Sequence, residues 1–136
     1  MMAYIEWKST YEVGFKAIDE QHIKLIHIMN ELFEAQKKGT GQLMVNESLK
    51  ELVEYTVYHF STEEKLFVQY EYPKAQKHIS EHQEFIDKIE SLKEEATKGN
   101  ILLSLKTMEY LKDWTINHIL GTDMEFGEFV RDRELG

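Results

Sequence analysis

Two pairs of potential metal ligands flank a predicted helix break, and this stretch constrains the fold more than any other. His59 and Glu63 form the first pair, and His78 and His82 form the second. Tyr72-Pro73 lies between them, where one helix is expected to end and the next to begin. Residues four apart on a helix project from the same face. The stretch therefore predicts two antiparallel helices that present three imidazoles and one carboxylate to a common interior.

Apolar residues recur at spacings of three and four along most of the chain, which indicates amphipathic helices. Asp19 and Asn100 stand at positions suited to an N-cap, and glycines follow two of the periodic segments. Short connections between helices of this length predict an all-α, up-down-up-down four-helix bundle. The first helix is expected from Asp19 to Gly39-Thr40-Gly41, and the second from Gln42 to Tyr70. The third is expected from Pro73 to about Gly99, and the fourth from Asn100 to Gly121.

The two ends of the chain do not follow this pattern. Residues 1–18 carry aromatic and branched side chains without a helical period, so we expect an extended arm against the bundle. A short C-terminal helix is expected over residues 123–132. The predicted organisation is a single domain, 1–136, with an N-terminal arm (1–18), a four-helix bundle (19–120) and a C-terminal segment (121–136).

Composition argues against several function classes. The 136 residues are 42% hydrophobic and contain no cysteine, which excludes thiolate metal sites, disulfides and iron–sulfur clusters. The formal charge of −9, without a basic tract, argues against nucleic acid and anionic membranes as partners. No apolar run is long enough to span a bilayer and no signal peptide is evident, so we expect a cytoplasmic protein.

Seven ionisable residues fall on the predicted buried faces, although such residues are rarely buried without partners. Asp123 follows His118 by five residues, which is off one helical face. The backbone is therefore expected to bulge or unwind near Gly121 and turn Asp123 inward. His27 lies off the apolar face and is expected to be exposed. The seven candidate ligands are His22, His59, Glu63, His78, His82, His118 and Asp123.

Each candidate has a simpler explanation when it is taken alone. A single histidine on an apolar face is more often a hydrogen-bonded core residue than a ligand. Glu63 could lie on the helix surface beside Glu64, and Asp123 could cap the last helix. Taken together, however, seven separate buried partners would be needed, and burying these groups without a cation would be costly. The set therefore predicts a shared metal site.

The donor set indicates two metal ions and favours iron. Five imidazoles and two carboxylates are too many for one tetrahedral zinc ion, and imidazole-rich sites disfavour calcium and magnesium. Two ions bridged by both carboxylates and one hydroxide or oxide would share these donors, with three histidines on one ion and two on the other. The second ion then keeps an open position for a small molecule. Iron suits so nitrogen-rich a set better than manganese.

The order and spacing of these residues resemble the hemerythrin family, and most closely its single-domain bacterial members. The resemblance extends from Trp7 to Phe126. Four motifs carry it, and they occur in order: Ile18-Asp19-x-x-His22-x-x-Leu25, His59-Phe60-x-x-Glu63-Glu64, Tyr72-Pro73-x4-His78-x3-His82, and Trp114-x3-His118-x4-Asp123.

The resemblance implies a non-haem di-iron centre (Fe2+/Fe3+ with a bridging hydroxide or oxide) that binds O2 reversibly for oxygen transport, storage or delivery. It implies that His78, His82 and His118 hold the coordinatively complete iron, that His22 and His59 hold the iron with the open position, and that Glu63 and Asp123 bridge both. Trp114 resembles the family's pocket tryptophan, and Leu25, Ile26 and Phe60 are O2-pocket candidates from their helix positions. We expect a monomer that is not an enzyme, with an oxygen-consuming protein as a candidate recipient.

Two other functions remain open from the sequence. A di-iron oxidase or peroxidase would typically use Glu-x-x-His pairs and a majority of carboxylates, whereas here imidazoles outnumber carboxylates by five to two. A sensing module for O2 or nitric oxide would typically be fused to a signalling domain, for which 136 residues leave no room. The rate of autoxidation distinguishes a carrier, in which it is slow, from an oxidase.

Overall fold

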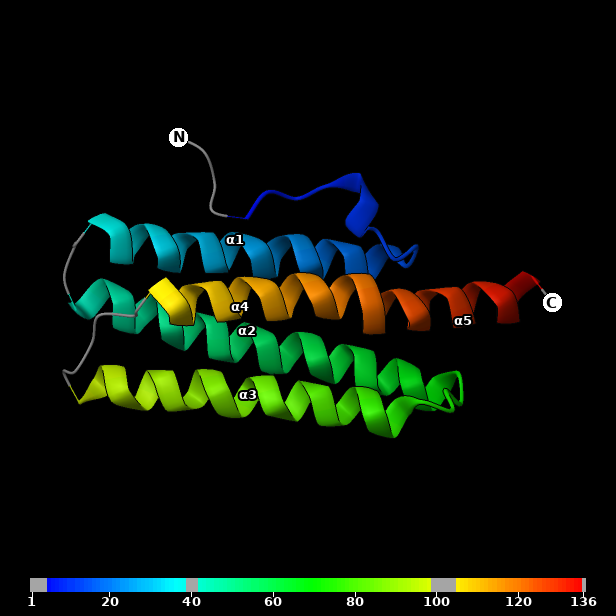
Figure 1. Ribbon diagram of the computed structural model, residues 1–136. Coiled ribbons are helices and arrows are strands. Elements are labelled where there is room, and N and C mark those ends of the chain that lie inside the picture. Colours follow the sequence, from blue (N-terminus) through cyan, green and yellow to red (C-terminus); the bar gives the residue numbers. More distant parts are fainter. Residues whose placement is uncertain (1–4, 39–41, 99–104, 136) are drawn as a thin grey trace.

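The computed structural model describes residues 5–38, 42–98 and 105–135, and this part of the chain is helical without a strand. The long helices α1, α2, α3 and α4 pack side by side, and a leading segment lies along the outer side of α1 (Figure 1). This is the predicted all-α bundle. Its elements are η1 (Ser9–Tyr11), α1 (Lys16–Lys38), α2 (Gln42–Gln69), α3 (Ala75–Thr97), α4 (Leu105–His118), the π-helical turn η2 (Ile119–Asp123) and α5 (Met124–Leu135).

The connection between α2 and α3 forms at the predicted break. Glu71 adopts a left-handed conformation with φ of 51°, and its N–H donates to the Val68 carbonyl at 3.2 Å. The next residue, Tyr72, donates to the Phe67 carbonyl at 2.9 Å, and the two rings lie 5.5 Å apart. These are the paired bonds and the apolar contact of a Schellman motif. Pro73 then follows, and α3 begins two residues later at Ala75.

The first helix begins earlier than predicted, because Asp19 has another role. The helix starts at Lys16, so Asp19 lies in its first turn and is not the N-cap. Its carboxylate instead accepts hydrogen bonds from the backbone N–H groups of Val13 at 2.8 Å and Gly14 at 3.3 Å. The side chain thus satisfies the backbone of the turn before the helix. The predicted start of the first helix at Asp19 is therefore wrong by three residues.

The leading segment is held against α1 and α5, although it is not extended throughout. The short helix η1 interrupts it, and Ile5 exchanges two hydrogen bonds with the Asn30 side chain, at 2.8 and 2.9 Å. Ile5, Tyr11 and Val13 are buried. The segment therefore contributes apolar side chains to the core, as predicted for the arm.

The second helix carries its apolar residues as the sequence pattern predicts. Buried residues continue along α2 from Leu49 to Phe67, and α2 packs against both α1 and α3. Two predicted helix ends, at Gly39-Thr40-Gly41 and near Gly99, lie outside the described residues, and so does the predicted Asn100 cap. No described helix combines the length and hydrophobicity that crossing a bilayer would require.

The fourth and fifth helices form one nearly straight run that is interrupted by the π-helical turn (Figure 1). The turn inserts an extra residue between His118 and Asp123, at the place where the sequence predicted a bulge. The C-terminal helix starts at Met124 and reaches Leu135, slightly beyond the predicted 123–132. This irregular turn brings a carboxylate from the last part of the bundle into its interior.

Gly127 on α5 allows the leading segment to approach closely. A Cβ at this position would meet the carbonyl oxygen of Val13 well inside contact distance. We expect Gly127→Ala to lower the free energy of unfolding by about 1–3 kcal/mol, the usual cost of overpacking. Urea denaturation measures this change. Gly121→Ala is the control, because its Cβ would meet nothing within 4 Å, and an equal loss in both variants would contradict the explanation.

Candidate metal centre

The seven candidate ligands converge in the interior of the bundle. They come from α1, α2, α3, α4 and the π-helical turn, and each has at most 5% of its surface exposed. His27, by contrast, has 64% of its side chain exposed and pairs with Glu31 at 2.8 Å on the outside of α1. The structure thus separates His27 from the other five histidines, as the helical spacing predicted.

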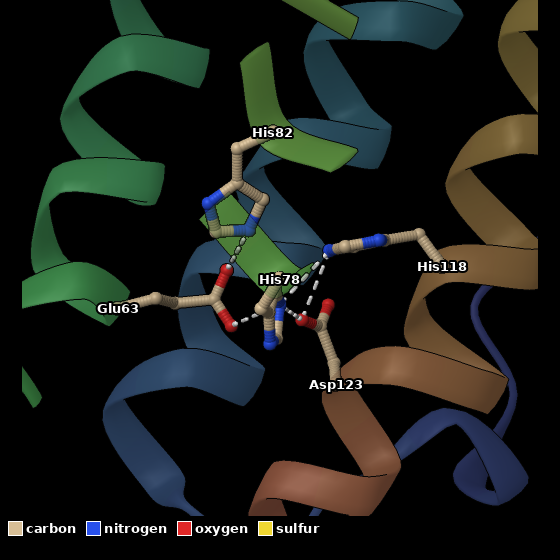
Figure 2. A group of neighbouring side chains, drawn as sticks. All are labelled: Glu63, His78, His82, His118 and Asp123. Atoms are coloured by element: carbon tan, nitrogen blue, oxygen red, sulfur yellow. Dashed lines mark hydrogen bonds and ion pairs between the residues drawn. The ribbon is translucent and has the colours of Figure 1, made fainter. Parts of the chain in front are cut away.

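The candidates form two overlapping groups, and both carboxylates belong to each group. Within a group, every residue offers a ligand atom within 4.8 Å of the others. Figure 2 shows the first group, in which three imidazoles and two carboxylates face a common point. The three-histidine group is Glu63, His78, His82, His118 and Asp123, and the two-histidine group is His22, His59, Glu63 and Asp123.

Asp123 contacts histidines of both groups. Its Oδ1 atom lies 2.8 Å from His78 Nε2 and 3.1 Å from His118 Nε2, while Oδ2 lies 3.0 Å from His22 Nε2. The two oxygens of this carboxylate are therefore divided between the groups. A carboxylate in this position can bridge two ions.

Glu63 also reaches both groups, through histidines of α2 and α3. Its Oε1 atom lies 3.2 Å from His59 Nε2 and 3.3 Å from His82 Nε2, and Oε2 lies 4.0 Å from His78 Nε2. Glu63 and His59 are four residues apart on one helix, as the sequence pattern required. Glu63 thus occupies the second position from which a carboxylate can bridge.

Several of these buried atoms lack the hydrogen bonds that burial normally demands. Among the described residues, His22 Nε2, His82 Nε2, both oxygens of Glu63 and Asp123 Oδ2 make no hydrogen bond of suitable geometry, although ion-pair contacts of 3.0 to 4.0 Å surround them. The Nε2 atoms of His78 and His118 face each other at 3.2 Å. Unpaired buried polar atoms are rare and need an explanation. Imidazole nitrogens and carboxylate oxygens that converge without satisfying one another fit a pair of metal ions of the imidazole-binding kind.

Electrostatics inside the site favours positive charge. Burial lowers the pKa of His118, but Asp123 and Glu81 outweigh that effect and raise it to about 10. Burial and Asp123 raise the pKa of Glu63, yet His59 and His82 lower it to about 2. In the absence of metal, a proton on His118 therefore offsets part of the negative charge of the two carboxylates. A divalent cation must compete with that proton.

Three of the histidines have a partner that orients the ring from outside the site. His59 Nδ1 lies 2.7 Å from Gln21 Oε1, His82 Nδ1 lies 3.0 Å from Glu64 Oε2, and His118 Nδ1 lies 3.0 Å from Glu81 Oε1. An acceptor at Nδ1 places the proton there and leaves Nε2 free to bind a metal. These partners therefore prepare three imidazoles as ligands.

The sequence interpretation did not identify these three partners as functional. Gln21, Glu64 and Glu81 each stand immediately beside a candidate ligand in the sequence, which is the signal that could have found them. Each partner, however, serves a histidine on the next helix and not its own neighbour. The partner for a given histidine can therefore be assigned only once the packing is known.

The predicted O2-pocket residues lie close to the site. Phe60 stacks on His82 with ring centroids 3.7 Å apart and also lies 5.7 Å from His59. Trp114 stacks on His118 at 4.5 Å. The two aromatic rings thus cover the three-histidine group more closely than the two-histidine group. Leu25 and Ile26 are buried in the core, one turn beyond His22.

Known proteins of similar sequence and fold were found over almost the whole chain. The hemerythrin model, described as the hemerythrin HHE cation binding domain, matches residues 13–130. A bacteriohemerythrin of Stenotrophomonas maltophilia is 33% identical over 131 residues, covering 96% of this chain and 84% of that protein. A hemerythrin-like protein of Naegleria gruberi is 32% identical over 120 residues, which is 88% of each chain.

Solved structures agree with these sequence matches. The crystal structure of a wild-type hemerythrin superposes with a TM-score of 0.86 at 24% identity, and covers 93% of this chain and 97% of that one. This likeness shows the shared fold. Because the family model spans most of the chain and a relative exceeds 30% identity along it, this chain belongs to the hemerythrin family.

Proposed function

We propose that the protein binds two iron ions and uses them to bind O2 reversibly, as the family resemblance implies. In this proposal His78, His82 and His118 hold one ion, His22 and His59 hold the other, and Glu63 and Asp123 bridge them. The observation that carries the proposal is the division of the buried donors into a three-histidine and a two-histidine group that share both carboxylates.

The unequal number of histidines is what suits the site to a small ligand. Three imidazoles and two carboxylates provide one more donor than two imidazoles and the same two carboxylates. The second position therefore has room for an additional ligand. Two iron ions bound in this way supply both that open position and the electrons that reversible O2 binding needs.

The protein's own residues hold the donors in place and keep water away. Gln21, Glu64 and Glu81 fix the rings of three histidines, which is the usual role of residues that contact a metal ligand from outside. On the two-histidine side, the Phe60 ring centroid lies 5.7 Å from that of His59, and the buried Leu25 and Ile26 lie one turn beyond His22, so apolar side chains stand beside the open position. We propose that this covering slows the loss of reduced oxygen species and so favours binding over oxidation.

The test measures metal content and the response to O2. Purified protein loaded with Fe2+ under argon is expected to retain about two irons per chain. Its visible absorption should change on exposure to O2 and return when O2 is removed, over many cycles. One zinc ion per chain after purification, or a spectrum that changes once and does not return, would exclude reversible binding.

Reversible O2 binding can serve several physiological roles. We propose oxygen transport, storage or delivery in the cytoplasm by a monomer. A single domain is supported by the contribution of all four long helices to one core and one site. Sensing of O2 or nitric oxide uses the same open position, and an oxidase would use the same iron pair. Slow autoxidation favours a carrier, whereas rapid catalytic consumption of O2 favours an enzyme.

A further inference from the structure

Glu81 joins two residues at opposite ends of the π-helical turn. It lies on α3, and its Oε1 atom accepts one hydrogen bond from His118 Nδ1 at 3.0 Å and another from Thr122 Oγ1 at 2.7 Å. His118 immediately precedes the turn, and Thr122 is the fourth of its five residues. One carboxylate oxygen therefore ties both ends of the turn to the neighbouring helix.

The turn needs such support because a regular helix would not bring its two ligands together. Five residues of α-helix rotate a side chain by roughly 140° away from its starting direction. Asp123 would then point away from the face that carries His118. The π-helical turn corrects this direction, but π-helical backbone is rare and occurs mostly as single turns at functional sites. The contacts that stabilise the turn therefore control whether Asp123 reaches the site.

The chemistry of the three groups gives each hydrogen bond a direction. A single oxygen of Glu81, Oε1, receives both hydrogen bonds, so the carboxylate acts as the acceptor for His118 and for Thr122. The Thr122 hydroxyl must then donate. His118 must donate from Nδ1, which leaves its Nε2 atom facing Asp123 at 3.1 Å. Glu81 itself belongs to neither group of candidate ligands.

We propose that Glu81 is a positioning residue that holds the π-helical turn through Thr122 and thereby sets both His118 and Asp123 as ligands. The inference rests on the proposed metal-binding role of those two residues. A carboxylate that merely oriented the His118 ring would not need Thr122. The contribution of Thr122 therefore separates a positioning role for the turn from the ordinary support of one imidazole.

The experiment compares four variants with the wild type. Glu81→Ala removes both hydrogen bonds, Glu81→Gln keeps an acceptor oxygen without the charge, and Thr122→Val removes only the bond from the turn at nearly constant side-chain volume. Glu90→Ala, on the exposed surface of the same helix, is the control. The first measurement is amide hydrogen exchange by NMR in the metal-free protein. The second is the affinity for Fe2+ under argon, by competition with a chelator.

We expect amides of residues 120–124 to exchange about tenfold faster in both Glu81→Ala and Thr122→Val, as for the loss of one hydrogen bond. Amides in the middle of α2 should be unchanged, which excludes general destabilisation. Fe2+ affinity should fall about 10- to 100-fold in Glu81→Ala, and also fall in Thr122→Val, as for other residues that support metal ligands. Glu81→Gln should retain exchange rates within about threefold of the wild type, and Glu90→Ala should match the wild type.

Two outcomes would overturn the inference. Wild-type exchange and affinity in Thr122→Val would reduce Glu81 to an orienting partner of His118 alone. Wild-type behaviour of Glu81→Ala would remove even that role. Neither measurement uses O2, so a wild-type protein that binds metal without binding O2 would refute the proposed function and leave this test intact. If the wild type bound no metal, hydrogen exchange would still decide whether Glu81 holds the turn.

Discussion

Glu63→Ala is expected to abolish tight metal binding at both positions of the centre, whereas His59→Ala should leave about one metal ion per chain. Glu63 offers a ligand atom to both groups of buried donors, while His59 belongs only to the two-histidine group. Removing the shared carboxylate also removes the negative charge that offsets two cations. Metal analysis after anaerobic loading and gel filtration measures the stoichiometry.

A matched control for both variants is Glu54→Ala, which alters an exposed carboxylate on the same helix. It should retain about two metal ions per chain. Because bound metal stabilises the folded state, loading should raise the melting temperature of Glu54→Ala and not that of Glu63→Ala. Two tightly bound ions in Glu63→Ala, or none in His59→Ala, would contradict the assignment of these residues to the two positions.

The metal-free protein is expected to lose stability as pH rises from about 6.5 to about 10. His118 binds its proton more tightly in the folded state, with a pKa of about 10, than in the unfolded chain, where the usual value is 6.5. Its contribution is therefore complete below pH 6.5 and is lost as pH rises through 10. One proton changes the free energy of unfolding by up to about 1.4 kcal/mol per pH unit.

Metal affinity should rise over the same interval, from about pH 6.5 to about pH 10, because a bound cation displaces the proton on His118. In acid, the folded pKa of Glu63 is about 2, below its usual value of 4.5. The contribution of Glu63 to the free energy of unfolding is therefore lost as pH falls from 4.5 to about 2. Urea denaturation of the metal-free protein across pH measures both limbs. The variant His118→Gln should flatten the alkaline limb, and a wild-type profile that is already flat from pH 6.5 to 9.5 would refute the explanation.

Helical spacing was sufficient to predict the bundle and to bring the seven candidates together, because residues four apart share one face of a helix and the apolar residues around them recur at spacings of three and four. The spacing of five between His118 and Asp123 even predicted where the helix had to deform. The start of α1 was wrong for a physical reason. An aspartate before an apolar helix can cap that helix or the preceding turn, and Asp19 accepts from Val13 and Gly14 instead.

The supporting residues could not be assigned from sequence, since they depend on which helix lies beside which. A residue next to an inward-facing ligand points about 100° to one side and so reaches an adjacent helix. Gln21 therefore serves α2, Glu64 serves α3 and Glu81 serves α4. Asp123 has no such neighbour, because neither Thr122, whose hydroxyl donates to Glu81, nor Met124 provides an acceptor for His22. Among the described residues, His22 Nδ1 therefore has no hydrogen-bond partner.

The neutral amide of Gln21 and the carboxylates of Glu64 and Glu81 give the centre a built-in polarity. The two anionic groups lie behind His82 and His118, and His59 has only the amide. Imidazoles backed by carboxylates are stronger electron donors, so the three-histidine side better stabilises an ion of higher valence. The halves are thus chemically unequal before any metal is bound, and an electron shared between two bound ions would reside preferentially on the two-histidine side.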